Sequence, residues 1–182
     1  MSAAHIRLAN LSDLPELTWI YNRYVTDTHI TFDTDPFTVD QRRPWFERFS
    51  ETGPHRLLVA EVASQPVGYA SSTEFRGKPA YRPSVETTIY LHPGFVGRGI
   101  GRVLYATLLE SITVEKTVHR AYGGIALPNE SSVALHESLG FALAGTFREV
   151  GLKFEKYWDV SWYERDVSGR DAAQRGDTAD RS

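Results

Sequence analysis

The chain has 182 residues, 41% of them hydrophobic and 24% charged, with a formal net charge of -3 at pH 7. This length suits a single domain with a sizeable core, and the small net charge excludes an overall attraction to nucleic acid or to an anionic membrane. Cysteine is absent, which excludes disulfides, thiolate metal sites and a cysteine nucleophile. The six histidines show no zinc spacing, so we expect no metal.

Targeting features are also missing. No apolar run is long enough to span a membrane, and residues 1–17 show neither the basic nor the continuous apolar region of a signal peptide. We therefore expect a cytoplasmic protein that acts on a small molecule and binds neither membrane nor nucleic acid.

The N-terminal part predicts one strand and two helices. Residues 5–9 suit a short strand, and helical spacing then predicts a helix that Ser12 or Asp13 caps and that ends near Thr28. A second helix is expected over 39–51.

Three strands follow. The runs 56–63 and 66–75 are separated by a short polar turn, which indicates a β-hairpin. The third run, 85–91, alternates strictly, so its side chains fall on two faces. One face carries Val85, Thr87, Ile89 and Leu91, and the other carries Glu86, Thr88 and Tyr90.

The remaining elements close a mixed α/β domain. A third helix begins near Ile100, a strand follows over 118–127, and a short helix over 129–140 has Asn129 as N-cap and Gly140 as its stop. Two closing strands are expected over 141–150 and 152–164. The folded domain is expected over 1–167 and a disordered tail over 168–182.

The turn "HPGFVGRGIG" places Gly97, Gly99 and Gly101 at the start of the third helix. Main-chain N–H groups there point outward at the positive end of the helix dipole, which suits a phosphate or pyrophosphate. A tight turn that is merely glycine-rich is the alternative. The turn lacks the lysine and hydroxyl residue of a nucleotide P-loop, and its spacing and position do not fit a dinucleotide fold. Coenzyme A is the remaining common pyrophosphate.

The segment "VGRGIG" resembles the acetyl-CoA motif of the GNAT N-acetyltransferase superfamily, with Val96 in place of the usual Arg or Gln. The blocks "SVETTIYLHP", "GIALPNESSVALHESLGF" and "GLKFEKYWDV" resemble the phosphinothricin acetyltransferase branch in sequence, order and spacing. The resemblance implies the GNAT fold, which is a mixed twisted sheet flanked by helices. It also implies acetyl-CoA as co-substrate, no metal, and a homodimer.

By this resemblance, the cofactor lies along the central strand, the glycine turn and the start of the fourth helix. Ile89, Tyr90 and Leu91 would line the pantetheine arm, and Asn129 would contact its far side. The pyrophosphate would be bound by Gly97, Arg98, Gly99, Ile100, Gly101 and Arg102.

Acetyl transfer requires loss of a proton from the acceptor ammonium, and Glu86 and His136 are the candidates for proton transfer. Glu86 lies mid-strand, where partial burial would raise its pKa, and the related enzymes have a glutamate there; a carboxylate paired with Arg82 is the alternative. His136 shares a helical face with Asn129 and Val133. The resemblance implies a histidine at a position where many GNAT enzymes have a tyrosine that acts as the acid for the thiolate. An exposed histidine without a role is the alternative.

The oxyanion donor implied by the resemblance is a main-chain N–H around Tyr90 or Leu91, left free where the central strand splays from its neighbour. Because cysteine is absent, direct transfer in a ternary complex is favoured over a covalent acyl-enzyme.

The acceptor pocket is expected to form from 29–37, 74–84 and 151–159, which are rich in aromatic and cationic residues. Each charge, taken singly, is equally a solvated loop residue. The candidates are Arg76, Arg82 and Lys153 for the carboxylate and polar head of an amino acid, and Phe32 and Tyr81 for its apolar stem.

The resemblance implies acceptors with a phosphinate, sulfone or sulfoximine group. Tyr157, where relatives tend to carry tryptophan, and the bulky "FEK" at 154–156 would reshape the pocket. Two alternatives stay open. One is an acetyltransferase for a protein N-terminus, a polyamine or an aminoglycoside, and the other is a noncatalytic CoA-binding module.

Overall fold

The computed structural model describes residues 4–169. A seven-stranded sheet of order β1-β2-β3-β4-β5-β7-β6 forms its centre. Neighbouring strands are antiparallel except for the parallel pair β4 and β5. This architecture confirms the mixed α/β fold expected from the sequence.

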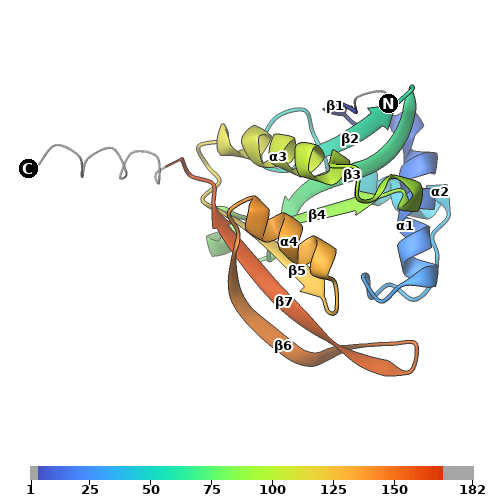
Figure 1. Cartoon of the computed structure of the whole chain (residues 1–182). Coiled ribbons are helices and arrows are strands. Elements are labelled where there is room, and N and C mark those ends of the chain that lie inside the picture. The colour runs from blue at the N-terminus through green and yellow to red at the C-terminus, as the bar shows by residue number, and fades with distance from the viewer. Residues whose placement is uncertain (1–3, 170–182) are drawn as a thin grey trace, which may run out of the picture.

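The helices and strands occur in the predicted order. The strands are β1 (His5–Leu8), β2 (Leu57–Val62), β3 (Gln65–Glu74), β4 (Ser84–Leu91), β5 (Arg120–Ala126), β6 (Ala142–Lys153) and β7 (Lys156–Asp166). The α-helices are α1 (Leu14–Asp27), α2 (Val39–Phe46), α3 (Ile100–Thr113) and α4 (Glu130–Ser138). Figure 1 shows α3 and α4 on the viewer's side of the sheet, with the long β6-β7 hairpin extending beyond α4.

Helices cover both faces of the sheet because its strands alternate. On β2, Leu58 and Ala60 pack into the core that contains the buried face of α3, whereas Leu57 and Val59 pack with Leu17 of α1. Side chains of successive strand residues point to opposite faces, so one strand serves two cores. The two layers together hold β4 at the centre of the sheet.

The two hairpins differ in how well their turns were predicted. The β2-β3 turn consists of Ala63 and Ser64, both with positive φ, close to the expected position. The expected break at residue 151 is wrong, because β6 continues to Lys153 and the chain turns at Phe154 and Glu155. Gly151 has another role: a Cβ there would lie 2.3 Å from Cζ of Phe32, so this glycine permits a close contact with a distant loop.

Two helix termini also differ from expectation. Asp13 stands at the N-cap position of α1, but its side chain makes no capping bond and Ser12 lies in a preceding 3-10 turn. The second helix ends at Phe46 instead of residue 51. Beyond it, the Arg48 N–H bonds to the Trp45 carbonyl oxygen, so the last turn tightens into i to i+3 bonds.

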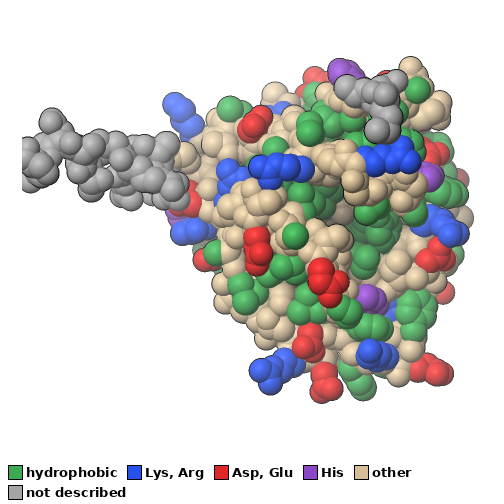
Figure 2. Space-filling view, viewed as in Figure 1, with side chains coloured by type: hydrophobic (Ala, Val, Ile, Leu, Met, Phe, Trp, Pro, Cys, Tyr) green, Lys and Arg blue, Asp and Glu red, His purple; other side chains and the backbone are tan. Residues whose placement is uncertain are grey.

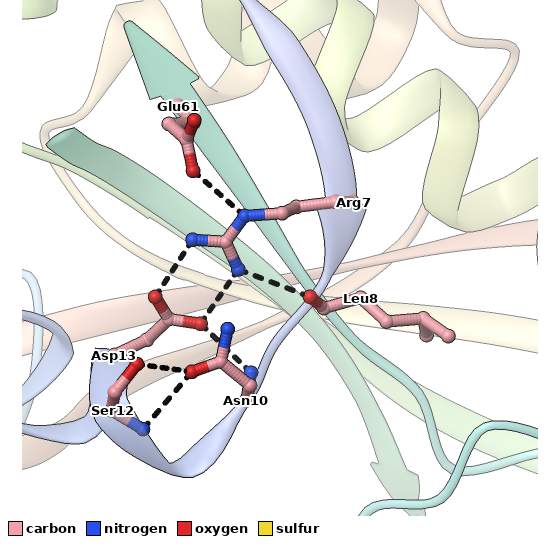
Figure 3. A network of polar contacts seen from close by, with 6 residues as sticks. All are labelled: Arg7, Leu8, Asn10, Ser12, Asp13 and Glu61. Atoms are coloured by element: carbon pink, nitrogen blue, oxygen red, sulfur yellow. Dashed lines mark hydrogen bonds and ion pairs between the residues drawn. The ribbon is translucent and has the colours of Figure 1, made fainter. Parts of the chain in front are cut away.

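The Asp13 side chain is used in a network that joins β1, β2 and the start of α1 (Figure 3). The Arg7 guanidinium donates to both carboxylate oxygens of Asp13, at 2.7 and 2.8 Å, and its Nε donates to Glu61 at 2.8 Å. The Asn10 N–H donates to the same Asp13 carboxylate. Burial alone would raise the pKa of Asp13, but these hydrogen bonds outweigh it and lower the pKa.

The feature that forms the site is a short parallel pairing. β4 and β5 are paired only from Ser84 with Arg120 to Glu86 with Tyr122, and the two strands separate beyond this point. Within 4–169, no helix is both long and apolar enough to cross a membrane. The predicted tail lies outside the described residues from 170 onward, and the predicted domain limit at residue 167 stays a prediction.

Candidate active site

A cleft of about 650 Å³ opens where β4 and β5 separate. Its walls come from the C-terminal half of β4, the glycine turn, the start of α3, β5 and α4, with α1 closing one side. Figure 2 shows this face of the molecule, in which hydrophobic side chains line a hollow and Lys and Arg side chains stand along its upper rim. An apolar cleft with a cationic rim suits a long ligand with a phosphorylated end.

Most of the predicted cofactor residues meet in this cleft. Arg98 and Ile100 do not line it: the Arg98 guanidinium lies over the Phe95 ring, and the Ile100 side chain is packed into the core. The predicted residues that line the cleft are Ile89, Tyr90, Leu91, Gly97, Gly99, Gly101, Arg102, Asn129 and His136.

The glycine turn has the backbone that a phosphate-binding turn needs. Gly97 and Gly99 both have φ +78°, a conformation that favours glycine, and Gly99 is the N-cap of α3. A Cβ on Gly101 would lie 3.2 Å from the Leu91 side chain, so this glycine lets α3 approach β4. The positive end of the α3 dipole is therefore next to the cleft, without side chains between them.

Strand alternation identifies the free main-chain donors on β4. The His92 N–H donates to the Val67 carbonyl oxygen, toward β3. Because successive N–H groups of a strand point to opposite sides, those of Leu91 and Ile89 point toward the gap left by β5. Tyr24 donates its hydroxyl hydrogen to the Leu91 carbonyl oxygen on that side, at 2.7 Å. Of the two expected oxyanion donors, this geometry favours Leu91 over Tyr90.

His136 is held at both ring nitrogens. Its Nδ1 lies 2.8 Å from the Ser132 carbonyl oxygen and its Nε2 lies 3.1 Å from the Tyr105 hydroxyl. The residue is 4% exposed, and burial lowers the pKa of the imidazole below its usual value, although the Ser132 hydrogen bond opposes this shift. The alternative of an exposed histidine is therefore wrong, because His136 is buried.

The Tyr105 hydroxyl continues the chain of contacts to β4 and β5. It lies 2.6 Å from Oγ1 of Thr87, which donates to the Tyr122 carbonyl oxygen at 3.1 Å. Both ends of the chain are carbonyl oxygens, which only accept, so its four contacts require four hydrogens. A neutral imidazole and two hydroxyls supply three, and protonation of His136 supplies the fourth. The fourth hydrogen bond thus favours protonation of His136, whereas burial of the imidazole disfavours it.

Glu86 is the last β4 residue paired with β5 and lies on the strand face opposite Thr87. It is half-buried, and within 4–169 it forms no ion pair with Arg82 or any other residue. Burial raises the pKa of its carboxyl group, an effect that the charge of Arg76 partly offsets. Glu86 borders the point where the cleft begins but does not line the cleft itself.

The five predicted acceptor residues fall into two groups, and none lines the cleft. Lys153 is buried and donates to the Thr31 carbonyl oxygen at 2.7 Å; burial lowers its pKa. Phe32 packs nearby against Gly151. The second group, on the loop between β3 and β4, consists of the exposed side chains of Arg76, Tyr81 and Arg82.

Sequence analysis missed several residues of this region. Thr87 and Ser132 line the cleft, Tyr105 connects Thr87 to His136, and Ser132 contacts His136 directly, but no motif marks any of the three. Val133, expected on the cofactor face with Asn129, packs against the core instead. The polar spacing of Asn129, Ser132 and His136, at i, i+3 and i+7, is the signal that could have replaced it.

Residues 6–162 match the acetyltransferase (GNAT) domain family. The chain belongs to the GNAT acetyltransferase family. A phosphinothricin N-acetyltransferase of Streptomyces coelicolor is 57% identical to it over 84% of this chain and 90% of the relative. An L-methionine sulfoximine/L-methionine sulfone acetyltransferase of Salmonella typhimurium is 32% identical over 87% and 92%.

The solved structures agree with the sequence relatives. The phosphinothricin acetyltransferase of Sinorhizobium meliloti, in complex with AcCoA, superposes with a TM-score of 0.87 at 30% identity, over 93% of this chain and 90% of that one. The GNAT fold, the class of acetyl-CoA-dependent acetyltransferase and the likeness to phosphinothricin acetyltransferases are thereby confirmed. Within 4–169, no group of three or more His, Asp and Glu side chains is placed to hold a metal.

Proposed function

We propose that the protein transfers the acetyl group of acetyl-CoA to the amino group of a small amino acid that carries a phosphinate, sulfone or sulfoximine group. The observation that carries the proposal is the cleft in which the Gly97–Arg102 turn, the free Leu91 N–H and His136 meet. The names of relatives with 57% and 32% identity support the acceptor class.

Acetyl-CoA, when bound, supplies the acetyl thioester. The N-terminus of α3 binds the pyrophosphate through the main chain of the glycine turn, which explains how Val96 can replace the usual Arg or Gln. The Leu91 N–H donates to the thioester carbonyl oxygen and stabilises the oxyanion that develops on it.

Glu86 removes a proton from the acceptor ammonium, directly or through water. A free α-amino group has a pKa of about 8, so much of the acceptor arrives protonated. Burial raises the pKa of Glu86 toward neutral pH, which makes its carboxylate a stronger proton acceptor.

His136 assists the proton transfer that accompanies departure of the thiolate. Its chain of contacts passes through Tyr105 to Thr87, and both His136 and Thr87 line the cleft. Uptake of a proton completes the hydrogen bonds of this chain, so the imidazole can hold a proton and release it within the site.

Two variants test these assignments. Glu86→Gln and His136→Ala are each expected to lower kcat/KM about 100-fold or more, the usual contribution of a positioned acid or base. Because only ionised Glu86 is a base, wild-type kcat/KM should fall as the pH drops through its raised pKa, and Glu86→Gln should lack this fall. Wild-type kcat/KM in both variants from pH 6 to 9 would disprove the mechanism.

Thiol release from acetyl-CoA identifies the acceptor. The wild-type enzyme is tested with phosphinothricin, methionine sulfone and methionine sulfoximine, beside ordinary amino acids, spermidine, an aminoglycoside and a short peptide. We expect turnover with the first three only. Turnover confined to another amine would overturn the acceptor class, and tight CoA binding without turnover would indicate a binding module.

We also propose a homodimer. The edge strand β6 and its turn expose several large apolar side chains, and apolar edge strands are normally covered. Sedimentation at the monomer mass would contradict this. The exposed side chains are Leu143, Phe147, Val150, Leu152 and Phe154, and Tyr157 at the start of β7 adds to them.

A further inference from the structure

Arg42 of α2 is a buried cation, with 7% of its surface exposed. Its guanidinium lies between aromatic rings, 3.8 Å from the centroid of Trp45 and 4.3 Å from that of Tyr21. The rings fix the plane and position of the group, and their faces attract its charge. They supply no hydrogen-bond acceptor of the kind that a guanidinium normally meets when buried.

The hydrogen bonds of Arg42 are incomplete. One terminal nitrogen donates to the Tyr69 hydroxyl at 3.3 Å, and Nε, although buried, has no partner. Across the described range 4–169, no Asp or Glu oxygen lies within 4.0 Å of this guanidinium. Buried arginines are normally paired with a carboxylate, so this one lacks its usual counter-ion.

Arg42 lines a separate pocket of about 340 Å³. Arg42 lines it together with the aromatic rings of Tyr21 and Trp45, and two residues, Thr88 and Tyr90, line both this pocket and the cleft. The pocket therefore lies on the strand face of Glu86, on the other side of Tyr90 from the cleft. Thr88 and Tyr90 thus form a boundary that the pocket and the cleft share.

We propose that Arg42 binds the anionic oxygens of the acceptor, either its carboxylate or its side-chain phosphinate, in this pocket. The inference rests on the proposed function and deepens it, because it makes Arg42 a specificity-determining residue. Two parallel N–H donors of a guanidinium match the two oxygens of either group. The aromatic rings hold the guanidinium in place before the ligand arrives, which reduces the entropy lost on binding.

The pocket also contains one carboxylate, which has to be considered. Asp33 lines the pocket, is exposed to solvent, and accepts a hydrogen bond from the Tyr21 hydroxyl. Its charge disfavours an anion, but water and Tyr21 solvate it, whereas the charge of Arg42 is enclosed. The pocket thus presents a buried cation beside an exposed, hydrogen-bonded anion, and the exposed Arg48 is a second cation in its lining.

Binding of matched acceptors to the full-length enzyme tests the inference. Methionine sulfone and its carboxamide differ in the carboxylate alone, and calorimetry without acetyl-CoA measures their Kd. If Arg42 binds the carboxylate, the wild-type enzyme should prefer the acid by about 10- to 100-fold, as expected for a charge-assisted hydrogen bond. Arg42→Met should reduce this ratio to about one through weaker binding of the acid, with little change for the carboxamide.

Arg43→Met is the matched control, because Arg43 is exposed on the same helix and lies outside the pocket. It should keep the wild-type ratio. An unchanged ratio in Arg42→Met, or equal losses for acid and carboxamide, would exclude the carboxylate as the group that Arg42 binds. Equal binding of acid and carboxamide by the wild-type enzyme would exclude the carboxylate as well, without any variant that has to fold.

A third ligand distinguishes the two sources of anionic oxygen. The decarboxylated analogue of phosphinothricin keeps the phosphinate and lacks the carboxylate. If Arg42 binds the carboxylate, Arg42→Met weakens methionine sulfone alone; if it binds the phosphinate, Arg42→Met weakens the decarboxylated analogue alone. Loss of neither overturns the inference.

The same experiment separates this inference from the proposed function. Acid-selective binding that depends on Arg42, without acetyl transfer in the thiol assay, would support the pocket and contradict the proposed activity. Acetyl transfer, with binding of both methionine sulfone and the decarboxylated analogue that Arg42→Met leaves intact, would support the activity and contradict the pocket.

Discussion

Arg7 and Arg42 place the same cation in two different surroundings. Arg7 lies at the sheet edge, is one-quarter exposed, and donates to the carboxylates of Asp13 and Glu61. Arg42 is more deeply buried, stacks between aromatic rings, and has no carboxylate within 4.0 Å among residues 4–169. The more accessible cation is the one that the protein neutralises.

This difference separates a structural pair from a binding group. The partners of Arg7 belong to β2 and to the start of α1, so the network fixes those elements to β1 (Figure 3). The ring partners of Arg42 fix the cation without neutralising it, which leaves it available to a ligand. Whether an arginine has a carboxylate partner, more than how deeply it is buried, therefore indicates which arginine has a function beyond folding.

The largest expected effect tests stability at both sites with the same substitution. Arg7→Met leaves the buried Asp13 carboxylate without its partner and should lower the free energy of unfolding by about 3–5 kcal/mol. Arg42→Met leaves no carboxylate unpaired and places a methionine among aromatic rings, so it should cost less than about 2 kcal/mol. Urea unfolding at pH 7 measures both.

The exposed ion pair of Arg23 with Asp27 provides the control for this comparison. Arg23→Met should change the free energy of unfolding by less than about 0.5 kcal/mol. Equal losses in Arg7→Met and Arg42→Met would remove the distinction between the two arginines.

A smaller effect is expected in acid. The pKa of Asp13 is lowered from 3.8 in the folded state, so its contribution to stability is present above that pH and is lost as the pH falls through the folded pKa. Unfolding free energies from pH 7 to 2.5 should therefore decline more steeply in the wild type than in Asp13→Asn. Parallel curves would show that the Arg7 network does not stabilise the fold through this carboxylate.

The smallest effect concerns the carboxylate beside Arg42. Asp33→Asn removes a charge that repels an anion and keeps an oxygen for Tyr21. It should tighten binding of methionine sulfone about 1.5- to 5-fold, the range expected for an exposed charge interaction, with no change for the carboxamide. Weaker binding of the acid would mean that Asp33 contributes to the anion site instead of opposing it.

Local patterns predicted the elements whose shape depends on neighbouring residues. The alternation of β4 holds, with Val85 and Thr87 buried on one face. Asn129 caps α4, and Gly140 has the left-handed conformation expected at its end. The β6-β7 turn was misplaced because a glycine at position 151 is typical of a turn. In the structure, a glycine is required there because Phe32, 119 residues away in sequence, occupies the space of a Cβ.

The site was predictable to the extent that its residues are close in sequence. The Gly97–Arg102 turn and Asn129 carry their geometry locally. The contacts of His136 with Tyr105 and Thr87 require β4, α3 and α4 to be assembled, and no local pattern contains them. Arg42 looks like an ordinary helical surface charge until Trp45 and Tyr21 enclose it.

The contact chain at His136 has a consequence for how fast a proton can move. With neutral His136, Nδ1–H donates to Ser132 and the Tyr105 hydroxyl donates to Nε2; with protonated His136, Nε2–H donates to Tyr105, which donates to Thr87. Only the Tyr105 hydroxyl hydrogen turns between these arrangements. The imidazole therefore gains and loses charge with no heavy atom displaced, and the reorganisation is a single bond rotation.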